Sequence, residues 1–335
     1  ITGNSLMLML PPADNDIFSA AGEKNLADVS GWSRGSVPAA RADIYIAGQD
    51  TVAVLGGTNV VYNSITVIDG ATLKVTGAFT LPAINLCYDS RILFASGTDV
   101  ELPVGVIATY AEPATLPVME VASGAKVRPA SNFEFKNVHL KNYGTIQCAT
   151  PTYFGTAEVG ETAYFALTAV SGTFDFLGTG FNCWVHPKAA GGRVKVAGKV
   201  SFKDSTITSS NISWFKCHVG RANPADEIID FELDNTVLDI RDNSACYFGG
   251  AVRFKCFNGG KVEKPRSITS PGIYGCPNFV EQVKLDFDGA DTRFMYYFNR
   301  YAVTFEPEID GYEQMTFRNG AYIHVMKLTG NGKSV

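Results

Sequence analysis

Short runs of alternating apolar and polar residues recur along the whole chain, and turn residues separate them. The first clear runs lie at residues 43–47, 51–54 and 64–76. Alternation with a period of two is the pattern of a strand that buries one face. No run of helical period stands between these segments, so the sequence predicts an all-β protein.

Later runs keep the alternation at irregular spacing. The segment 133–140 alternates strictly, and further strands are expected at 194–202, 228–231, 237–240, 252–254, 283–287, 302–305 and 322–326. Turn pairs such as Asn258-Gly259 and Asp288-Gly289 lie between them. The chain therefore consists of many short strands joined by turns and loops.

Three architectures could use such strands. A propeller would show a regular repeat of matched motifs, which this sequence lacks. A pair of β-sandwiches remains as the alternative, although no change in composition marks a linker between two cores. A right-handed parallel β-helix tolerates irregular coil lengths, because loops can extend from a constant cross-section. It also explains the segment 70–77, in which Leu73 and Val75 would point inward. We therefore expect the β-helix.

A solenoid needs a cap, because its end coil would otherwise expose apolar surface. We expect residues 1–30 to form an N-terminal strand and a capping loop. Residues 31–335 are expected to form a single β-solenoid domain. The strand-like segment 327–333 indicates that this solenoid continues beyond Val335.

Composition narrows the class of protein. The chain has 335 residues, 46% hydrophobic and 18% charged, which is typical of a folded globular chain. Its formal net charge of −5 argues against a nucleic-acid partner, which would require clustered basic residues. No apolar run approaches the ~20 residues that cross a bilayer, so no membrane span is expected. No phosphate-binding or dinucleotide-binding motif is present, and no cofactor is expected.

The seven cysteines contain no C-x-x-C pair, which excludes a zinc ribbon. We expect them to be small buried residues. Cys246 and Cys256 are the nearest pair in the sequence, and a bridge between them stays open.

An N-terminal motif of the form W-x-x-G-x-V-P-x-x-x-x-D comprises Trp32, Gly35, Val37, Pro38 and Asp43, and G-A-T-L-x-V-x-G follows at 70–77. This opening resembles that of bacterial secreted or surface parallel β-helix proteins. It is similar to autotransporter-like repeats and to the glycine-rich first domain of some extracellular β-helix proteins. The resemblance implies a β-helix in an extracellular or cell-surface location. It implies no catalytic residue, because such openings precede adhesins, structural proteins and polysaccharide-degrading enzymes alike.

Two groups of acids are candidates for catalysis. Asp286 and Asp288 have the i, i+2 spacing that places both on one strand face, and glycoside hydrolysis needs two carboxyl groups. Together with Asp291 they are also candidate calcium ligands. The alternative is a strand end whose outward acids close in an Asp-Gly turn. Asp239 and Arg241 form a second candidate face, and the alternative there is a solvated ladder of opposite charges.

A cluster of aromatic and basic residues is a candidate ligand-binding surface, because aromatic faces stack on sugar rings. Its members are Arg293, Tyr296, Tyr297, Arg300 and Tyr301. Core packing of the aromatic rings is the alternative. The four histidines share no metal-ligand spacing. His139 should point away from the face that Val138 and Leu140 share.

These observations favour a non-catalytic extracellular or cell-surface solenoid, such as an adhesin, a fibre or surface-layer component, or a scaffold. Such a protein could assemble with itself through the solenoid ends or edges. A carbohydrate-active β-helix, either a polysaccharide hydrolase or lyase or a glycan-binding module, is the alternative. A phage tail or receptor-binding β-helix is a further alternative.

Overall fold

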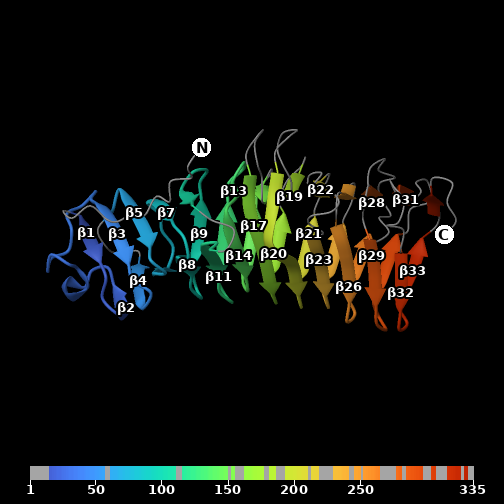
Figure 1. Ribbon diagram of the computed structural model, residues 1–335, viewed down its shortest axis with the longest axis horizontal. Helices are drawn as coiled ribbons and strands as arrows, with labels where there is room; N and C mark the ends of the chain where they lie inside the picture. The colour runs from blue at the N-terminus through green and yellow to red at the C-terminus, as the bar shows by residue number, and fades with distance from the viewer. Residues whose placement is uncertain are drawn as a thin grey trace, which may run out of the picture.

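The computed structural model describes residues 15–56, 61–110, 115–149, 152–154, 162–176, 181–185, 193–209, 213–218, 229–240, 245–249, 252–264, 277–280, 284–296, 303–306, 315–325 and 328–330. These residues form an elongated rod of stacked β-coils (Figure 1). Every pairing between its named strands is parallel, and non-consecutive strands are neighbours in each sheet. The expected parallel β-helix is therefore confirmed. The sandwich-pair alternative is wrong, because it would require antiparallel strand pairs in two separate cores.

Four parallel sheets, A to D, line the rod. Sheet A contains β1 (Asp16–Phe18), β3 (Asp43–Ala47), β5 (Ser64–Ile68), β7 (Ala83–Leu86) and β10 (Ile107–Thr109). Sheet B contains β2 (Gly22–Asn25), β4 (Thr51–Gly56), β6 (Thr72–Thr76), β8 (Arg91–Phe94), β11 (Val118–Val121), β14 (Val138–Asn142), β17 (Thr162–Val170), β20 (Arg193–Lys203), β23 (Ile229–Asp234), β26 (Val252–Phe257), β29 (Lys284–Asp288) and β32 (Met315–Arg318).

Sheet C contains β9 (Asp99–Leu102), β12 (Lys126–Pro129), β15 (Thr145–Cys148), β18 (Thr173–Phe176), β21 (Thr206–Ser209), β24 (Val237–Ile240), β27 (Lys261–Lys264), β30 (Arg293–Tyr296) and β33 (Tyr322–Val325). Sheet D contains β13 (Glu134–Phe135), β16 (Thr152–Phe154), β19 (Phe181–Val185), β22 (Ser213–His218), β25 (Ala245–Gly249), β28 (Pro277–Val280), β31 (Val303–Glu306) and β34 (Leu328–Gly330). A single 3-10 turn, Val29–Gly31, occurs within the described residues. The described part of the chain contains no helix long and apolar enough to cross a membrane.

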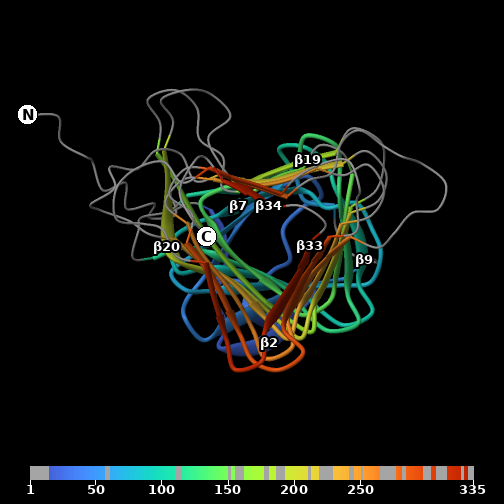
Figure 2. The same ribbon diagram turned by 90° about the vertical axis from the view of Figure 1, so that its right-hand side faces the viewer.

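The cross-section is three-sided, as Figure 2 shows when the rod is viewed along its length. Sheets B and C meet at one corner, and β7 of sheet A lies on the third side with β19 and β34 of sheet D. Sheet B runs the whole length of the rod with twelve strands, and at the usual strand spacing they span roughly 50 Å. Among the described strands, those of the first coils belong to sheets A and B, and the strands of sheets C and D begin later in the chain.

A continuous row of inward side chains fills the interior beside sheet B. Its members, each in register with the next, are Leu55, Val75, Phe94, Val121, Asn142, Ala169, Phe202, Leu233, Cys256, Phe287 and Phe317. The row is buried from Leu55 to Phe287. The prediction that Leu73 and Val75 point inward is confirmed, since neither side chain is exposed. Successive coils thus share one dry core.

Asn142 is the polar member of this row, and it is fully buried. Its Nδ2 donates to the carbonyl oxygen of Thr173 at 3.1 Å, and its Oδ1 accepts from the N–H of Gly144 at 3.1 Å. A buried amide is tolerated when its hydrogen bonds are satisfied, as they are here. Asn142 therefore links its own corner to the next coil.

The corner between sheets B and C has room only for small side chains. The residues that directly precede the strands of sheet C are Thr98, Ala125, Gly144, Gly172, Ser205, Thr236, Gly260, Thr292 and Ala321, and we call them the corner column. All but the half-buried Ala321 are buried. Its hydroxyl groups donate to nearby carbonyl oxygens, as Thr236 does to Asp234 at 2.9 Å and Thr292 does to Asp288 at 2.8 Å. The small side chains of the column let sheets B and C approach closely at the corner, and these hydroxyl groups still have hydrogen-bond partners.

The N-terminal end is closed by Trp32, the first residue of the motif noted in the sequence. Its ring packs edge-on against Phe18 with the centroids 5.2 Å apart, and its Nε1 donates to the carbonyl oxygen of Leu26 at 2.9 Å. The N–H of Ser33 bonds to the carbonyl of Ile17, so this loop also covers the free edge of β1. Residues 1–14, which include the apolar segment 6–10, lie outside the described residues.

The prediction that residues 133–140 alternate without a break is wrong. Phe133 and Phe135 are buried, but the next buried residues are Val138 and Leu140, so the alternation changes phase. Asn137 has a φ of 52°, a left-handed conformation that turns the chain from sheet D into sheet B. A corner residue, rather than a single strand, separates the two halves of this segment.

Candidate functional site

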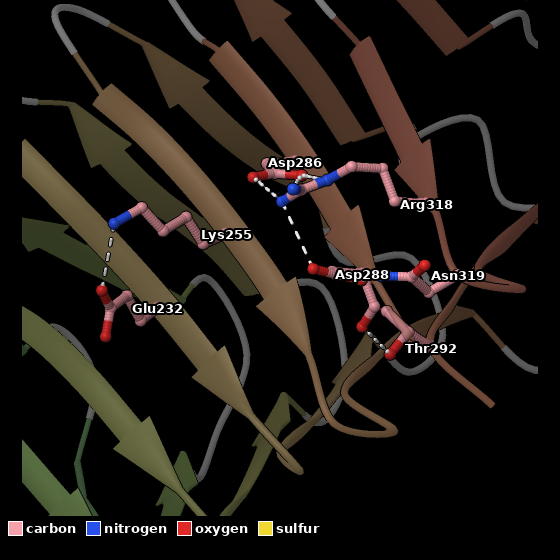
Figure 3. A network of polar contacts seen from close by, with 7 residues as sticks. All are labelled: Glu232, Lys255, Asp286, Asp288, Thr292, Arg318 and Asn319. Atoms are coloured by element: carbon pink, nitrogen blue, oxygen red, sulfur yellow. Dashed lines mark hydrogen bonds and ion pairs between the residues drawn. The ribbon is translucent and has the colours of Figure 1, made fainter. Parts of the chain in front are cut away.

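Asp286 and Asp288 lie on the outer face of β29, as their spacing predicts. Phe287 between them is buried, while both aspartate side chains are about one third exposed. The two carboxylates therefore point to the same side of sheet B, away from the core (Figure 3).

Both carboxylates are bound by one arginine from the next coil. Arg318 Nη2 lies 2.8 Å from Asp286 Oδ2 and 3.0 Å from Asp286 Oδ1. The same nitrogen lies 3.3 Å from Asp288 Oδ2. Asn319 Nδ2 donates to Asp288 Oδ1 at 2.7 Å (Figure 3). The acid pair thus has a cation and an amide as partners, and each carboxylate is held across the boundary between two coils.

The same arrangement occurs a second time, at the N-terminal part of sheet C. Asp99 and Glu101 are an i, i+2 acid pair on β9, and Arg128 of the next coil is in register with Glu101. Arg128 Nη2 lies 3.2 Å from Asp99 Oδ1 and 3.7 Å from Glu101 Oε1, which are ion-pair distances without well-aligned hydrogen bonds. In both cases the arginine stands opposite the second acid of the preceding strand. This repetition indicates a stacking device, which we call the arginine staple.

Opposite charges also alternate along the outer face of sheet B before the acid pair. Glu232, Lys255 and Asp286 are in register on three successive strands. Lys255 Nζ lies 3.3 Å from Glu232 Oε1, and Glu232 is only 7% exposed (Figure 3). Nearer the N-terminus, Arg91 Nη2 pairs with Glu120 Oε1 at 2.8 Å. Charge pairing between coils is therefore a general feature of this face.

The proposed calcium ligands do not form a cluster. Asp291 is exposed in the corner after β29, with a φ of 67°, while Asp286 and Asp288 are bound by Arg318. Among the described residues, no group of three or more histidine, cysteine, aspartate or glutamate side chains could hold a metal ion.

The other sequence candidates lie on a different side of the rod. Asp239 belongs to β24, and Arg293 and Tyr296 belong to β30, both in sheet C, whereas Asp286 and Asp288 belong to sheet B. In the strand register, Asp239 lies opposite Glu263, and Arg293 lies opposite Lys261. Arg241, Tyr297, Arg300 and Tyr301 lie outside the described residues. The two candidate acid groups therefore do not converge on one face.

The cysteines that the structure describes in detail are buried thiols. Cys87, Cys148 and Cys256 are all buried, and none of the three forms a disulfide bond. The bridge between Cys246 and Cys256 that the sequence left open is therefore absent. Burial raises the pKa of the Cys256 thiol far above its usual range, which keeps it protonated and unreactive.

His139 points outward from β14, as predicted, and its Nε2 lies 3.0 Å from Thr168 Oγ1. Partial burial, and secondarily the charge of Lys141, lower its pKa below 6.5. The unfolded chain then binds a proton more readily than the folded chain at pH values just below 6.5. Protonation therefore favours unfolding, and stability falls as the pH drops through this range.

We expect the wild-type protein to lose more stability than His139→Gln when the pH falls from about 7 to about 5. Thermal unfolding of the two proteins at a series of pH values measures this difference. Parallel pH profiles for the two proteins would contradict the assigned pKa direction.

The sequence analysis did not identify Arg318 and Arg128, the arginines that form ion pairs with both acids of each pair. A signal for Arg318 was present in the sequence. The segment 315–320 repeats the apolar alternation and turn of 285–289, and aligning the two places Arg318 opposite Asp288. Comparison of the chain with protein-family models, with curated proteins and with solved structures finds no match.

Proposed function

We propose that this chain is a non-catalytic β-solenoid that serves as a rigid scaffold of the extracellular or cell-surface type. The observation that carries the proposal is the repeated arginine staple. An acid pair that worked in hydrolysis would need one carboxyl group to donate a proton and the other to activate water or attack. Asp286 and Asp288 instead share one guanidinium, and the same register of two acids and one arginine recurs at Asp99 and Glu101 on another sheet.

The regular interior supports the same proposal. Each coil contacts mainly its neighbours, so the length of such a rod depends on the number of coils. The outer face of sheet B carries pairs of opposite charge between coils at several places along the rod. Such a face holds the register between coils and keeps the strands soluble. The extracellular setting rests on the resemblance of the 32–77 opening to secreted β-helix proteins.

A comparison of two matched double variants tests the proposal. Asp286→Asn/Asp288→Asn and Asp99→Asn/Glu101→Gln each remove the acids of one arginine staple. We expect no turnover by the wild type or by either variant on a panel of neutral and acidic polysaccharides, assayed for new reducing ends and for unsaturated uronates. Both variants should lose a similar, small amount of stability, below about 1 kcal/mol for each exposed ion pair.

Suppose instead that the wild type is active and that only the Asp286→Asn/Asp288→Asn protein loses this activity. That result would contradict the proposal and identify the protein as a polysaccharide hydrolase or lyase. The second variant controls for general loss of folding, because its staple has the same design.

A further inference from the structure

Two Asp-Gly corners of the rod share their local sequence but differ in their surroundings. Residues 68–71 read Ile-Asp-Gly-Ala, and residues 287–290 read Phe-Asp-Gly-Ala. Asp69 directly follows β5, and Asp288 is the last residue of β29. A third such pair, Asp310-Gly311, lies outside the described residues. The first two pairs therefore show one motif in two settings inside the rod.

The Asp288-Gly289 pair is held by the next coil at both of its reactive groups. The N–H of Gly289 donates to the carbonyl oxygen of Arg318 at 3.1 Å. The Asp288 carboxylate accepts from Asn319 Nδ2 at 2.7 Å and lies 3.3 Å from Arg318 Nη2 (Figure 3). Neither the glycine nitrogen nor the carboxylate can therefore change position unless contacts between two coils open.

The Asp69-Gly70 pair is not held in this way. Asp69 is exposed, and the two residues have φ angles of 55° and 74°, as in a type I′ turn. The N–H of Ala71 closes this turn on the carbonyl oxygen of Ile68 at 3.1 Å. The described residues include the neighbouring corners 48–50 and 87–90, and they supply no hydrogen-bond partner for the Asp69 carboxylate or the Gly70 N–H. The two groups can approach each other without breaking a contact between coils.

Such an approach leads to succinimide formation. The glycine nitrogen attacks Cγ of the preceding aspartic acid in its protonated form, and the new N–Cγ bond closes a five-membered ring. The bond from Cγ to the hydroxyl group breaks, and this group leaves as water with the proton from the glycine nitrogen. Water then opens the ring at either carbonyl group, giving aspartate or isoaspartate. Glycine allows the attack because it has no side chain to obstruct the ring.

We propose that Asp69 is a site of isoaspartate formation, and that contacts with the next coil, including the hydrogen bond from Asn319, protect Asp288 from the same reaction. Isoaspartate continues the chain through its side-chain carbonyl, so it adds one atom to the backbone between Ile68 and Ala71. The turn bond between these two residues is then lost. The carbonyl of Ala71 accepts from the N–H of Arg91 at 2.9 Å, so the change also reaches the next coil.

The test uses the folded protein, incubated in mildly acidic buffer, digested and analysed peptide by peptide with mass spectrometry and isoaspartate detection. We expect isoaspartate to form at least about fivefold faster at Asp69 than at Asp288, the factor that one ordinary hydrogen bond represents. In denaturant the two rates should converge, because both sites read Asp-Gly-Ala and both lose their coil contacts. Equal rates in the folded protein, or a faster rate at Asp288, would overturn the proposal.

A variant separates protection by the next coil from the difference in backbone conformation between the two sites. Asn319→Gly removes the donor to Asp288 and still accepts the φ of 53° at position 319. It should speed the reaction at Asp288 about fivefold and leave Asp69 unchanged. An unchanged rate at Asp288 in the folded variant would refute the protective role of this hydrogen bond.

Should Asn319→Gly fail to fold, the comparison of the two sites in the wild type still decides whether Asp69 is the reactive one. Asp69→Glu is the matched control, because it keeps the charge and its longer side chain cannot close the five-membered ring. It should abolish only the signal at position 69. A signal that persists there in this variant would show that the detected product is not isoaspartate from Asp69.

Discussion

Replacement of Trp32 by alanine is expected to lower the free energy of unfolding of the N-terminal coils by about 3–5 kcal/mol, the range for truncating a buried aromatic residue. Trp32 is 5% exposed and covers the end of the core. Its removal deletes the edge-on contact with Phe18 and the hydrogen bond to the carbonyl of Leu26. It also leaves Tyr62, whose ring centroid lies 6.3 Å from that of Trp32, without its aromatic neighbour.

The loss should be local, because each coil of a solenoid is supported mainly by its neighbours. Amide hydrogen exchange should therefore accelerate most in β1 to β5 and least in β26 to β32. Trp32→Phe is the matched control, since it keeps an aromatic ring and loses the indole N–H, and it should cost much less. Uniform acceleration along the whole rod would show that the end coils do not unfold separately from the rest.

The strands and their buried faces could be predicted from the sequence because alternation is a local signal. Leu73 and Val75 illustrate this, since both were placed correctly from their immediate neighbours. The corners, where the chain passes from one sheet to the next, were harder to predict. At Asn137 the chain changes sheet without a glycine or proline, because asparagine itself adopts the left-handed conformation. The alternation on either side was therefore mistaken for one strand.

The partners of the candidate site could not be predicted in the same way. Which residue stands opposite Asp288 depends on the number of residues in the coil that follows, and coil lengths vary. One coil of sheet B takes the chain from Thr72 to Arg91, whereas a longer one takes it from Leu167 to Val200. Thus Asp286 and Asp288 could be recognised as an outward pair, but Arg318, which binds both, lies in another coil. The register between coils places Arg318 beside both acids, which makes them ion-pair partners of an arginine.

Gly144 shows how closely successive coils approach at the corner between sheets B and C. A Cβ atom at this position would lie 2.4 Å from the carbonyl oxygen of Ala122 and 2.6 Å from that of Ala125. Neither carbonyl can move freely, because each already accepts a backbone hydrogen bond, from Ala125 and Thr145 respectively. Steric contact with fixed backbone, rather than an unusual φ angle, therefore requires glycine here.

We expect Gly144→Ala to destabilise the protein by about 3 kcal/mol or more. The added methyl group would clash with backbone atoms, and they can move away only if backbone hydrogen bonds are disturbed. Gly56→Ala is the matched control. Its Cβ would lie 3.3 Å from the side-chain oxygen of Thr76, which can rotate away, so the cost should be below about 1 kcal/mol. Chemical denaturation of both variants measures the difference. Alanine already occupies the equivalent place in the preceding coil, at Ala125, and is buried there. A tolerated Gly144→Ala would therefore mean that the coils can separate locally at this corner, and that the corner column does not fix their spacing.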